Sequence, residues 1–267
     1  TERLDARAYV GKTEPGFGTG QQLSTEVGVR KAGIDARLRF GETWQGLTEV
    51  FTEETLATGT ERKHGSLELR RETAANRIGF GVRKVEDEGL ASGAQRSGQA
   101  FASGSVDLWN QRVTLRASAD AALGGENSSV DYPNRYVLGA DYALRPDVKL
   151  YTEYEHADGA SFDADMARVG VRATPWHRAQ LNTGVSQQAT EYGPRTFANF
   201  GLTQGWRLSE RWSLDLGIDQ SNTLRGTDLA PLNPNVPLAS GSTTDDFFAS
   251  FVGAQYHQEL WTATARA

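Results

Sequence analysis

The chain has 267 residues, of which 38% are hydrophobic and 23% charged, and its formal net charge is −6. Its apolar runs are only a few residues long, which excludes a transmembrane helix, because such a helix needs roughly 20 apolar residues. The absence of cysteine excludes disulfide frameworks, thiol catalysis and cysteine-ligated zinc, and the acidic balance argues against a general nucleic-acid-binding protein.

The composition narrows the fold to two classes. The chain holds 6 Trp, 8 Tyr and 11 Phe although it is polar, and its 29 Gly and single Met fit poorly with a helical bundle. Such a chain is either an all-β soluble protein or a transmembrane β-barrel, in which only every second strand residue faces lipid. The N-terminus lacks the pattern of a signal peptide, so we expect a mature form or a fragment.

Apolar and polar residues alternate along most of the chain. The clearest case is 212–219, where Trp, two Leu and Ile alternate with Ser, Asp, Gly and Asp. The same period of two occurs at 34–40, 77–83, 112–120 and 178–186. Strict alternation predicts strands with one apolar and one polar face, and no segment shows convincing helical spacing.

Fifteen strands are expected from this pattern. They cover residues 2–11, 22–31, 34–43, 64–72, 76–85, 99–109, 112–121, 135–145, 148–157, 163–173, 177–187, 196–207, 211–220, 247–257 and 260–267. Most have about 9–11 residues, the length that crosses a bilayer at a tilt of about 45°. Soluble strands more often have about 5–6. Because bacterial single-chain barrels have even numbers of strands, we expect about 14–16 strands. Two explanations of the odd count stay open: the count is wrong by one, or the chain is truncated at one or both ends and belongs to a larger barrel.

The connections alternate between short and long. Short ones are expected at 31–33, 72–75, 109–111, 145–147, 174–176, 209–211 and 258–259, and long polar ones at about 12–21, 44–63, 86–98, 122–134, 157–162, 188–195 and 221–246. Tight turns at one end and extended loops at the other are typical of outer-membrane barrels.

Tryptophan placement supports the same class. Trp109, Trp176, Trp206, Trp212 and Trp261 lie within about four residues of an expected tight turn, which predicts one aromatic girdle at a membrane interface.

The polar face of a barrel points into the lumen. The basic residues expected there are Arg37, Arg39, Arg70, Arg77, Arg83, Arg112, Arg116, Arg168, Arg172, Arg178 and Arg207, and the acidic ones are Glu68, Asp107, Glu153, Asp215 and Asp219, with Asp35, Asp141 and Glu155 also on this face. Two interpretations stay open: a hydrated pore that selects polar or charged solutes, or charges that pair across strands and stiffen the wall. Glycines on the same face, such as Gly81, Gly170, Gly184, Gly201 and Gly217, leave room for an inserted loop or allow strong curvature.

Signs of chemistry are few. His156 neighbours Glu155, Asp158, Asp163 and Asp165, which fits a barrel hydrolase or a divalent-cation site, although a solvated loop is the favoured interpretation. There is no nucleophile elbow, phosphate loop or H-E-x-x-H motif. We therefore expect no enzyme, no cofactor and no metal site.

The segments YALRPDVKLYTEYEH, VRATPWHRAQLNTGVS and GWRLSERWSLDLGID resemble those of Gram-negative outer-membrane β-barrels. They look like the C-terminal barrels of large bacterial surface proteins. The resemblance implies the bacterial outer membrane as location, the lipid bilayer and lipopolysaccharide as partners, and further domains of a larger chain.

The sequence thus predicts an all-β fold, with one transmembrane antiparallel up-and-down β-barrel domain over 1–267. The expected function is a pore or translocation conduit for polar solutes or an extended chain. The alternatives are a non-conducting membrane anchor of a larger adhesin-like assembly and a soluble β-sandwich.

Overall fold

The computed structural model describes residues 3–14, 28–89, 93–127, 132–159, 163–190, 193–226, 246–258 and 261–266. These residues form β1 (Leu4–Thr13), β2 (Val29–Phe40), β3 (Trp44–Thr55), β4 (Thr60–Glu72), β5 (Asn76–Glu88), β6 (Gln95–Leu108), β7 (Val113–Asn127), β8 (Asn134–Arg145), β9 (Val148–Asp158), β10 (Asp163–Ala173), β11 (Ala179–Thr190), β12 (Gly193–Arg207), β13 (Trp212–Arg225), β14 (Phe247–Gln258) and β15 (Trp261–Arg266). The strands follow one another through the sheet in chain order. The expected fold class, an all-β antiparallel up-and-down sheet of about 14–16 strands, is confirmed. In the described part of the chain, no helix is long and apolar enough to span a membrane.

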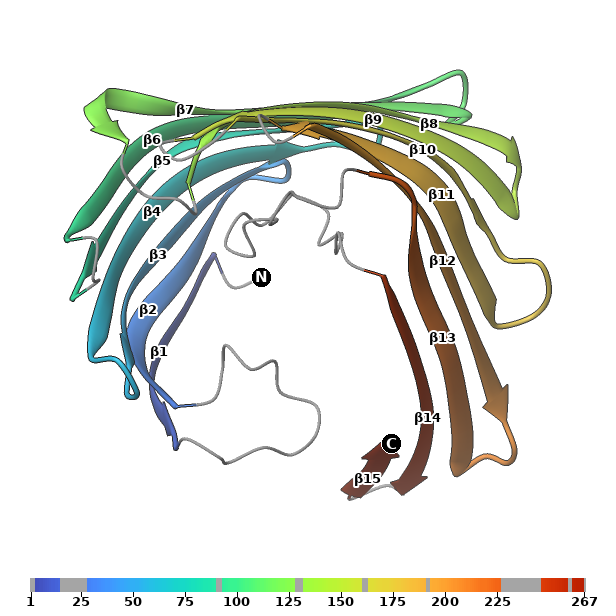
Figure 1. Ribbon diagram of the computed structural model, residues 1–267. Coiled ribbons are helices and arrows are strands. Elements are labelled where there is room, and N and C mark those ends of the chain that lie inside the picture. The colour runs from blue at the N-terminus through green and yellow to red at the C-terminus, as the bar shows by residue number, and fades with distance from the viewer. Residues whose placement is uncertain are drawn as a thin grey trace. The chain divides into compact units, whose positions relative to one another are not determined.

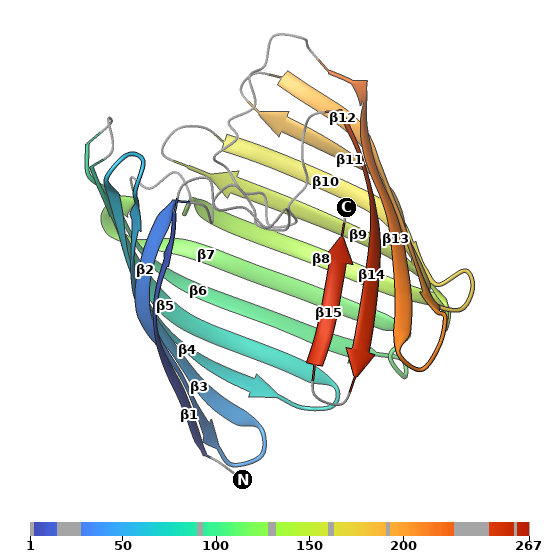
Figure 2. The same cartoon turned by 90° about the horizontal axis from the view of Figure 1, so that it is seen from below.

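The chain divides into two compact units. Unit 1 comprises Thr1–Leu108, Leu115–Leu138 and His156–Asp163, and unit 2 comprises Trp109–Thr114, Gly139–Glu155 and Ala164–Ala267. In unit 1, β1 to β6 lie side by side and curve together, as do β10 to β14 in unit 2, so each of these sheets has a concave and a convex face (Figure 1). Figure 2 shows the antiparallel course of β14 and β15, whose arrows point in opposite directions.

The strand register decides which side chains share a face, because residues directly opposite each other on antiparallel strands lie on the same side. Asp35 on β2 lies opposite Arg7 and Glu49, and these charged residues share the concave face of unit 1. In unit 2, Leu216 lies opposite Val252 on the convex face. The alternation in the sequence therefore becomes two chemically different faces of one layer.

One predicted hairpin is wrong. Residues 31–33, expected as a turn, lie inside β2, and part of the expected long loop 44–63 is β3. Gly33 is a strand residue: a Cβ atom there would lie 2.7 Å from the Cβ of Phe51 and 2.7 Å from the hydroxyl of Tyr9. The glycine thus makes room for side chains of the two neighbouring strands. Of the expected strand 22–31, residues 22–27 lie outside the described residues.

Several other expected loops are also largely strand. β5 continues to Glu88 and β7 continues to Asn127. β11 continues to Thr190, and β12 already begins at Gly193. Ion pairs hold these polar extensions, as between Arg62 and Asp87 at 2.6 Å. Charged pairs across strands stabilise a ladder where both faces are polar, so the alternation of hydrophobicity disappears before the strand ends. The strands consequently have up to 15 residues.

Candidate functional site

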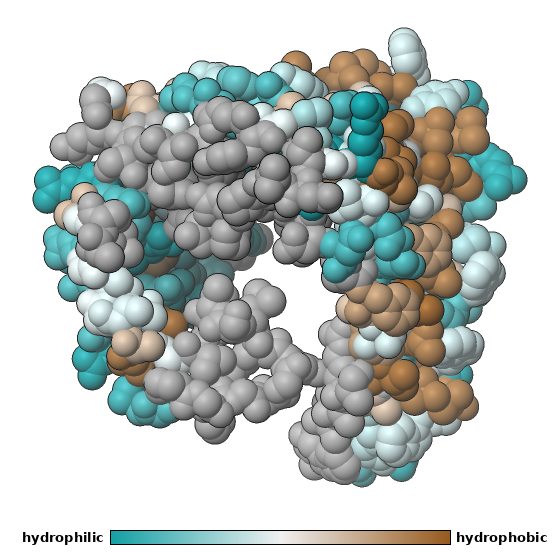
Figure 3. Space-filling view, in the orientation of Figure 1, coloured by the Kyte–Doolittle hydropathy of each residue, from teal (hydrophilic) through white to brown (hydrophobic). Residues whose placement is uncertain are grey.

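The two faces of the sheet have the reverse of the polarity found in soluble proteins. Large apolar side chains are exposed, among them Leu138 at 61% and Val169 at 60%, whereas polar ones such as Gln99 and Glu155 are buried at 0% and 1%. In Figure 3 hydrophobic residues gather along the outer side of β11 to β13. The convex face is therefore the apolar one and the concave face the polar one, and the candidate functional site is the concave face.

The apolar belt of the convex face covers about two-thirds of the thickness of a bilayer's hydrocarbon core, which is about 30 Å. On β2 it runs from Ala32 to Phe40, about 27 Å of strand at roughly 3.3 Å per residue, or about 20 Å after a tilt of about 45°. Toward the loop end the convex face becomes charged, where Lys63 lies 3.3 Å from Glu88.

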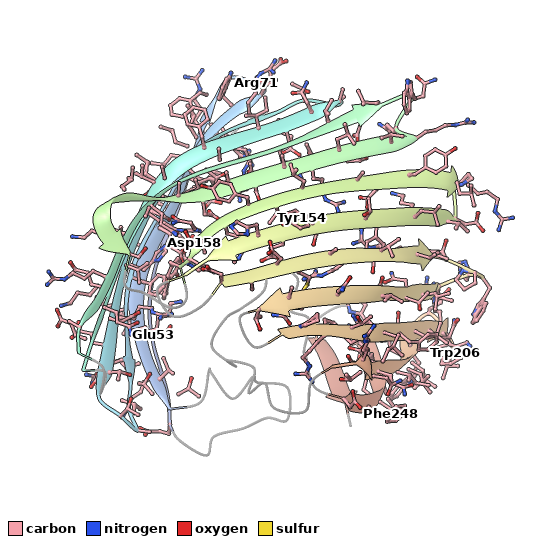
Figure 4. All side chains as sticks on the ribbon, turned by 45° about the horizontal axis from the view of Figure 1, so that its top comes forward. Glu53, Arg71, Tyr154, Asp158, Trp206 and Phe248 are labelled. Carbon is pink, nitrogen blue, oxygen red and sulfur yellow. The ribbon has the colours of Figure 1, made fainter. Side chains whose placement is uncertain are left out.

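Aromatic side chains border this belt at the short turns. Trp109, Trp176, Trp206 and Trp212 are exposed there, and Trp44, which the sequence pattern placed in a loop, follows a short turn at the same end. Figure 4 shows the side chain of Trp206 on the outer side of β12, and that of Phe248 on the outer side of β14 toward the opposite, loop end. The side chain of Trp261 lies outside the described residues.

One polar side chain interrupts the apolar face in this girdle. Gln204 shares the convex face with Ala179 and Leu216, which lie opposite it. Its side-chain oxygen accepts the indole N–H of Trp176, and its Nε2 donates to the carbonyl of Gly205 at 2.6 Å. Gln204 is therefore shielded and hydrogen-bonded at a position where the strand pattern calls for an apolar residue.

The concave face of unit 1 carries ion pairs. Arg7 and Asp35 are 3.1 Å apart, Lys31 and Glu53 3.6 Å, and Arg70 pairs with Glu68 at 2.9 Å. These contacts join neighbouring strands or residues two apart on one strand. They favour the interpretation that many of the lumen-facing charges stiffen the wall.

Arg83 is the centre of a second network in unit 1, which also includes Tyr132 and Pro133 from the segment that precedes β8. Its guanidinium lies 2.7 Å from Asp120, donates to Gln99 at 2.8 Å and lies 5.1 Å from the ring centre of Tyr132. Gln99 in turn donates to the carbonyls of Tyr132 at 2.7 Å and Pro133 at 2.8 Å. The residues that precede β8 are thus held over the concave face of β5 and β6.

Arg168 holds the corresponding network of unit 2. Its side chain is 9% exposed and lies 3.3 Å from Glu153 and 3.8 Å from the buried Glu155, and it also donates to the sulfur of Met166. Met166 packs with the buried Phe197. This part of the concave face is closed to solvent although it is polar and charged.

The expected lumen residues fall into three groups. Arg70, Arg77, Arg83, Arg168, Arg172, Glu68 and Glu153 make ion pairs. The second group occupies strand positions that share the concave face, and its members are Arg37, Arg39, Arg116, Arg207, Asp107, Asp215 and Asp219. Arg112 and Arg178 lie in turns and not in the expected strands, and Arg178 has a φ of 61°. Lining a water-filled pore stays a prediction for all three groups.

The concave glycines do not all provide open space. The ring of Phe101 lies over Gly81, Tyr151 lies over Gly170 and Gly184, and Phe251 lies directly against Gly217. At these positions aromatic rings of neighbouring strands fill the space, as in the pairing of strand glycines with aromatic residues.

His156 does not assemble a site with its sequence neighbours. Its ring stacks with Tyr136 at 6.4 Å on the convex face, whereas Glu155, the adjacent strand residue, points to the concave one. Asp165 accepts the hydroxyl of Tyr154 at 2.7 Å. No group of three potential ligands is placed to hold a metal ion in the residues that the structure describes. The hydrolase and cation interpretations stay untested hypotheses.

Asp246, just before β14, fixes the loop end of unit 2. Its carboxylate accepts the backbone N–H of Thr223, and this hydrogen bond is the main cause of a lowered pKa for Asp246. The ionised carboxylate thus ties the start of β14 to β13.

No protein-family model and no curated protein matches the chain. Among solved structures, it is similar to the siderophore receptor PirA from Pseudomonas aeruginosa, with 14% identity over 89% of this chain and 51% of that one, and a TM-score of 0.45. It is also similar to the copper transporter OprC, with 12% identity over 89% of this chain and 49% of that one, and a TM-score of 0.44. The chain spans about half the length of these two proteins.

Proposed function

We propose that this chain forms the wall of a β-barrel in the outer membrane of a Gram-negative bacterium and lines a conduit for polar solutes. The observation that carries the proposal is the reversed polarity, with exposed apolar side chains on the convex face and buried or paired charges on the concave one. Soluble monomers rarely expose apolar patches larger than a few hundred Å². Contact with lipid makes such an exposed apolar face favourable, since each Å² of apolar surface that is removed from water stabilises the protein by about 25 cal/mol.

The charged end of the convex face suits a second partner. Beyond the apolar belt, Lys63, Glu88 and Glu86 lie among further charges of both signs. Phosphate and sugar groups of lipopolysaccharide offer charged and polar contacts at the level where the hydrocarbon ends. We therefore assign lipid to the belt and lipopolysaccharide to the charged extension.

The concave face supports passive passage of polar solutes or of an extended chain. It presents both signs of charge at solvent-exposed positions such as Arg37 and Asp219. A hydrated passage needs such groups, because water and polar solutes lose hydrogen bonds along an apolar wall. The proposal assigns no catalytic step and no cofactor to this face.

A second function, a non-conducting anchor of a larger surface assembly, is favoured by one observation. Concave-face residues are buried in both units: Val85, Ser97 and Gln99 in one, Glu155 and Ser221 in the other. A face that is closed to solvent at these positions fits a blocked lumen.

Conductance separates the two functions. The protein, folded in detergent and added to planar lipid bilayers, is expected to give discrete current steps whose size rises with salt concentration. Silent bilayers that contain correctly folded protein would instead support the anchor. Recovery of the protein in the soluble fraction, monodisperse without detergent, would contradict both.

A further inference from the structure

The concave face of unit 2 contains a trough of about 510 Å³ that extends from the start of β9 to β14. One cross-strand row runs through it, made of Arg172, Asn182, Gly201 and Asp219. Because neighbouring strands lie about 4.8 Å apart, the two charged ends of this row are separated by roughly 14 Å of sheet. The trough therefore crosses the strands, with a cation at one end and a carboxylate at the other.

The floor of the trough carries no side chain at its centre, Gly201. A Cβ atom there would lie 3.7 Å from the carboxylate of Asp219 and 3.8 Å from the carbonyl of Asn182, which is ordinary van der Waals contact. In the next row, the ring of Phe251 lies against Gly217. The ring of Phe251 thus lies in the row next to Gly201, where the floor carries no side chain.

The polar groups of the trough suit a ligand with many hydroxyl groups. Gln180 and Thr203 lie opposite each other in the row of Phe251, and they add an amide and a hydroxyl to the amide of Asn182 and the carboxylate of Asp219. Such groups accept and donate hydrogen bonds without demanding a charge on the ligand.

The charges of the trough do not favour an ionic ligand. The guanidinium of Arg172 already lies 3.6 Å from Asp141 and 4.3 Å from the ring centre of Tyr151. Asp147, at the rim, lies 3.6 Å from Arg145. With its cations and carboxylates in equal number, Lys149 and Arg172 against Asp147 and Asp219, the lining has no net charge.

We infer that the trough binds a neutral saccharide of a few sugar units. One sugar ring places its C–H face on Phe251, and its hydroxyls bond to Asn182, Gln180 and Asp219. Sites of this kind combine an apolar surface with a few converging polar groups. The inference deepens the proposed conduit function, on which it rests, by naming the class of polar solute.

The binding experiment uses the full chain folded in detergent, with maltotriose as the probe and isothermal titration calorimetry as the readout. We expect saturable binding with a millimolar dissociation constant. Gly201→Leu fills the floor and is expected to weaken binding at least about tenfold. The matched control is Gly11→Leu, also on a concave face with nothing within 4 Å of its Cβ position, which is expected to bind as the unmodified chain does.

A second variant keeps the shape of the trough. Asp219→Asn retains hydrogen bonding but removes the charge that strengthens it, so a loss of about threefold or more is expected. The inference is overturned if maltotriose gives no saturable heat, if Gly201→Leu binds as tightly as the unmodified chain, or if the zwitterion glycylglycine binds more tightly than maltotriose. Current steps in the same preparation without sugar binding overturn only this inference, whereas sugar binding without current steps overturns the conduit.

Discussion

The indole N–H of Trp176 is donated to the side-chain oxygen of Gln204, a residue of the apolar convex face. In lipid no water is present to hydrogen-bond an unpaired amide, so this contact explains how the strand tolerates glutamine there.

Trp176→Phe should therefore destabilise the protein by about 1–3 kcal/mol, because the oxygen of Gln204 loses its donor in an apolar setting. The change is measured by urea unfolding in lipid vesicles. Trp176→Phe combined with Gln204→Leu should recover part of the loss. Trp109→Phe, at the exposed girdle, is the control and should cost less. Equal losses for both single Trp variants would contradict this role of Trp176.

Gln99→Ala should release the residues before β8 from the concave face. The carbonyls of Tyr132 and Pro133 both lose their donor, at a cost of about 1–3 kcal/mol each. Hydrogen exchange followed by mass spectrometry should show faster exchange in peptides around 132–138, together with larger current steps in bilayers. Gln45→Ala, another concave-face glutamine, should leave both unchanged. Unchanged exchange in Gln99→Ala would rule out the attachment.

Arg168→Met should be among the most costly substitutions in unit 2. It leaves Glu155, which is 1% exposed, without its cation, and breaking a buried ion pair costs about 3–5 kcal/mol. Adding Glu155→Gln should restore part of the stability in the same unfolding assay. Arg172→Met removes a half-exposed pair and should cost at most about 1 kcal/mol. A similar loss for the two arginines would show that the Arg168 network is not specially buried.

Protonation of Asp246 should loosen the start of β14. Because folding lowers the pKa of this carboxyl, the stabilisation is present at neutral pH and disappears as the pH falls through the lowered value. The protection factor of the Thr223 amide should therefore fall in acid. Asp246→Asn should remove most of this pH dependence, and a pH dependence that persists in the variant would assign it to another group.

Period-two alternation was enough to predict the single-layer antiparallel sheet and most strands from residue 76 onward. It failed at 31–63, where β3 carries polar residues on both faces and its pairing with β2 and β4 is visible only in three dimensions. It also missed the strand extensions, because Arg62 and Asp87 stabilise pairing through charge rather than hydrophobicity.

The sequence predicted which residues lie on the concave face, but it did not predict which of them contact one another. The register places Arg168 beside Glu153 and brings Phe251 onto Gly217, and neither contact has a signal in the sequence. Arg112 and Arg178 fit the alternating pattern of polar residues, but they belong to turns. The alternation alone does not show where a strand begins.

The most direct measurement follows β13 residue by residue. The chain has no cysteine, so single cysteines at Leu214, Asp215, Leu216, Ile218 and Asp219 can each carry a nitroxide label in the protein folded into lipid vesicles. Collision with dissolved oxygen should be high at 214, 216 and 218, and collision with a water-soluble nickel chelate should be high at 215 and 219. Equal exposure of all five labels to the nickel chelate, or loss of the period of two, would contradict a sheet with lipid on one face and water on the other.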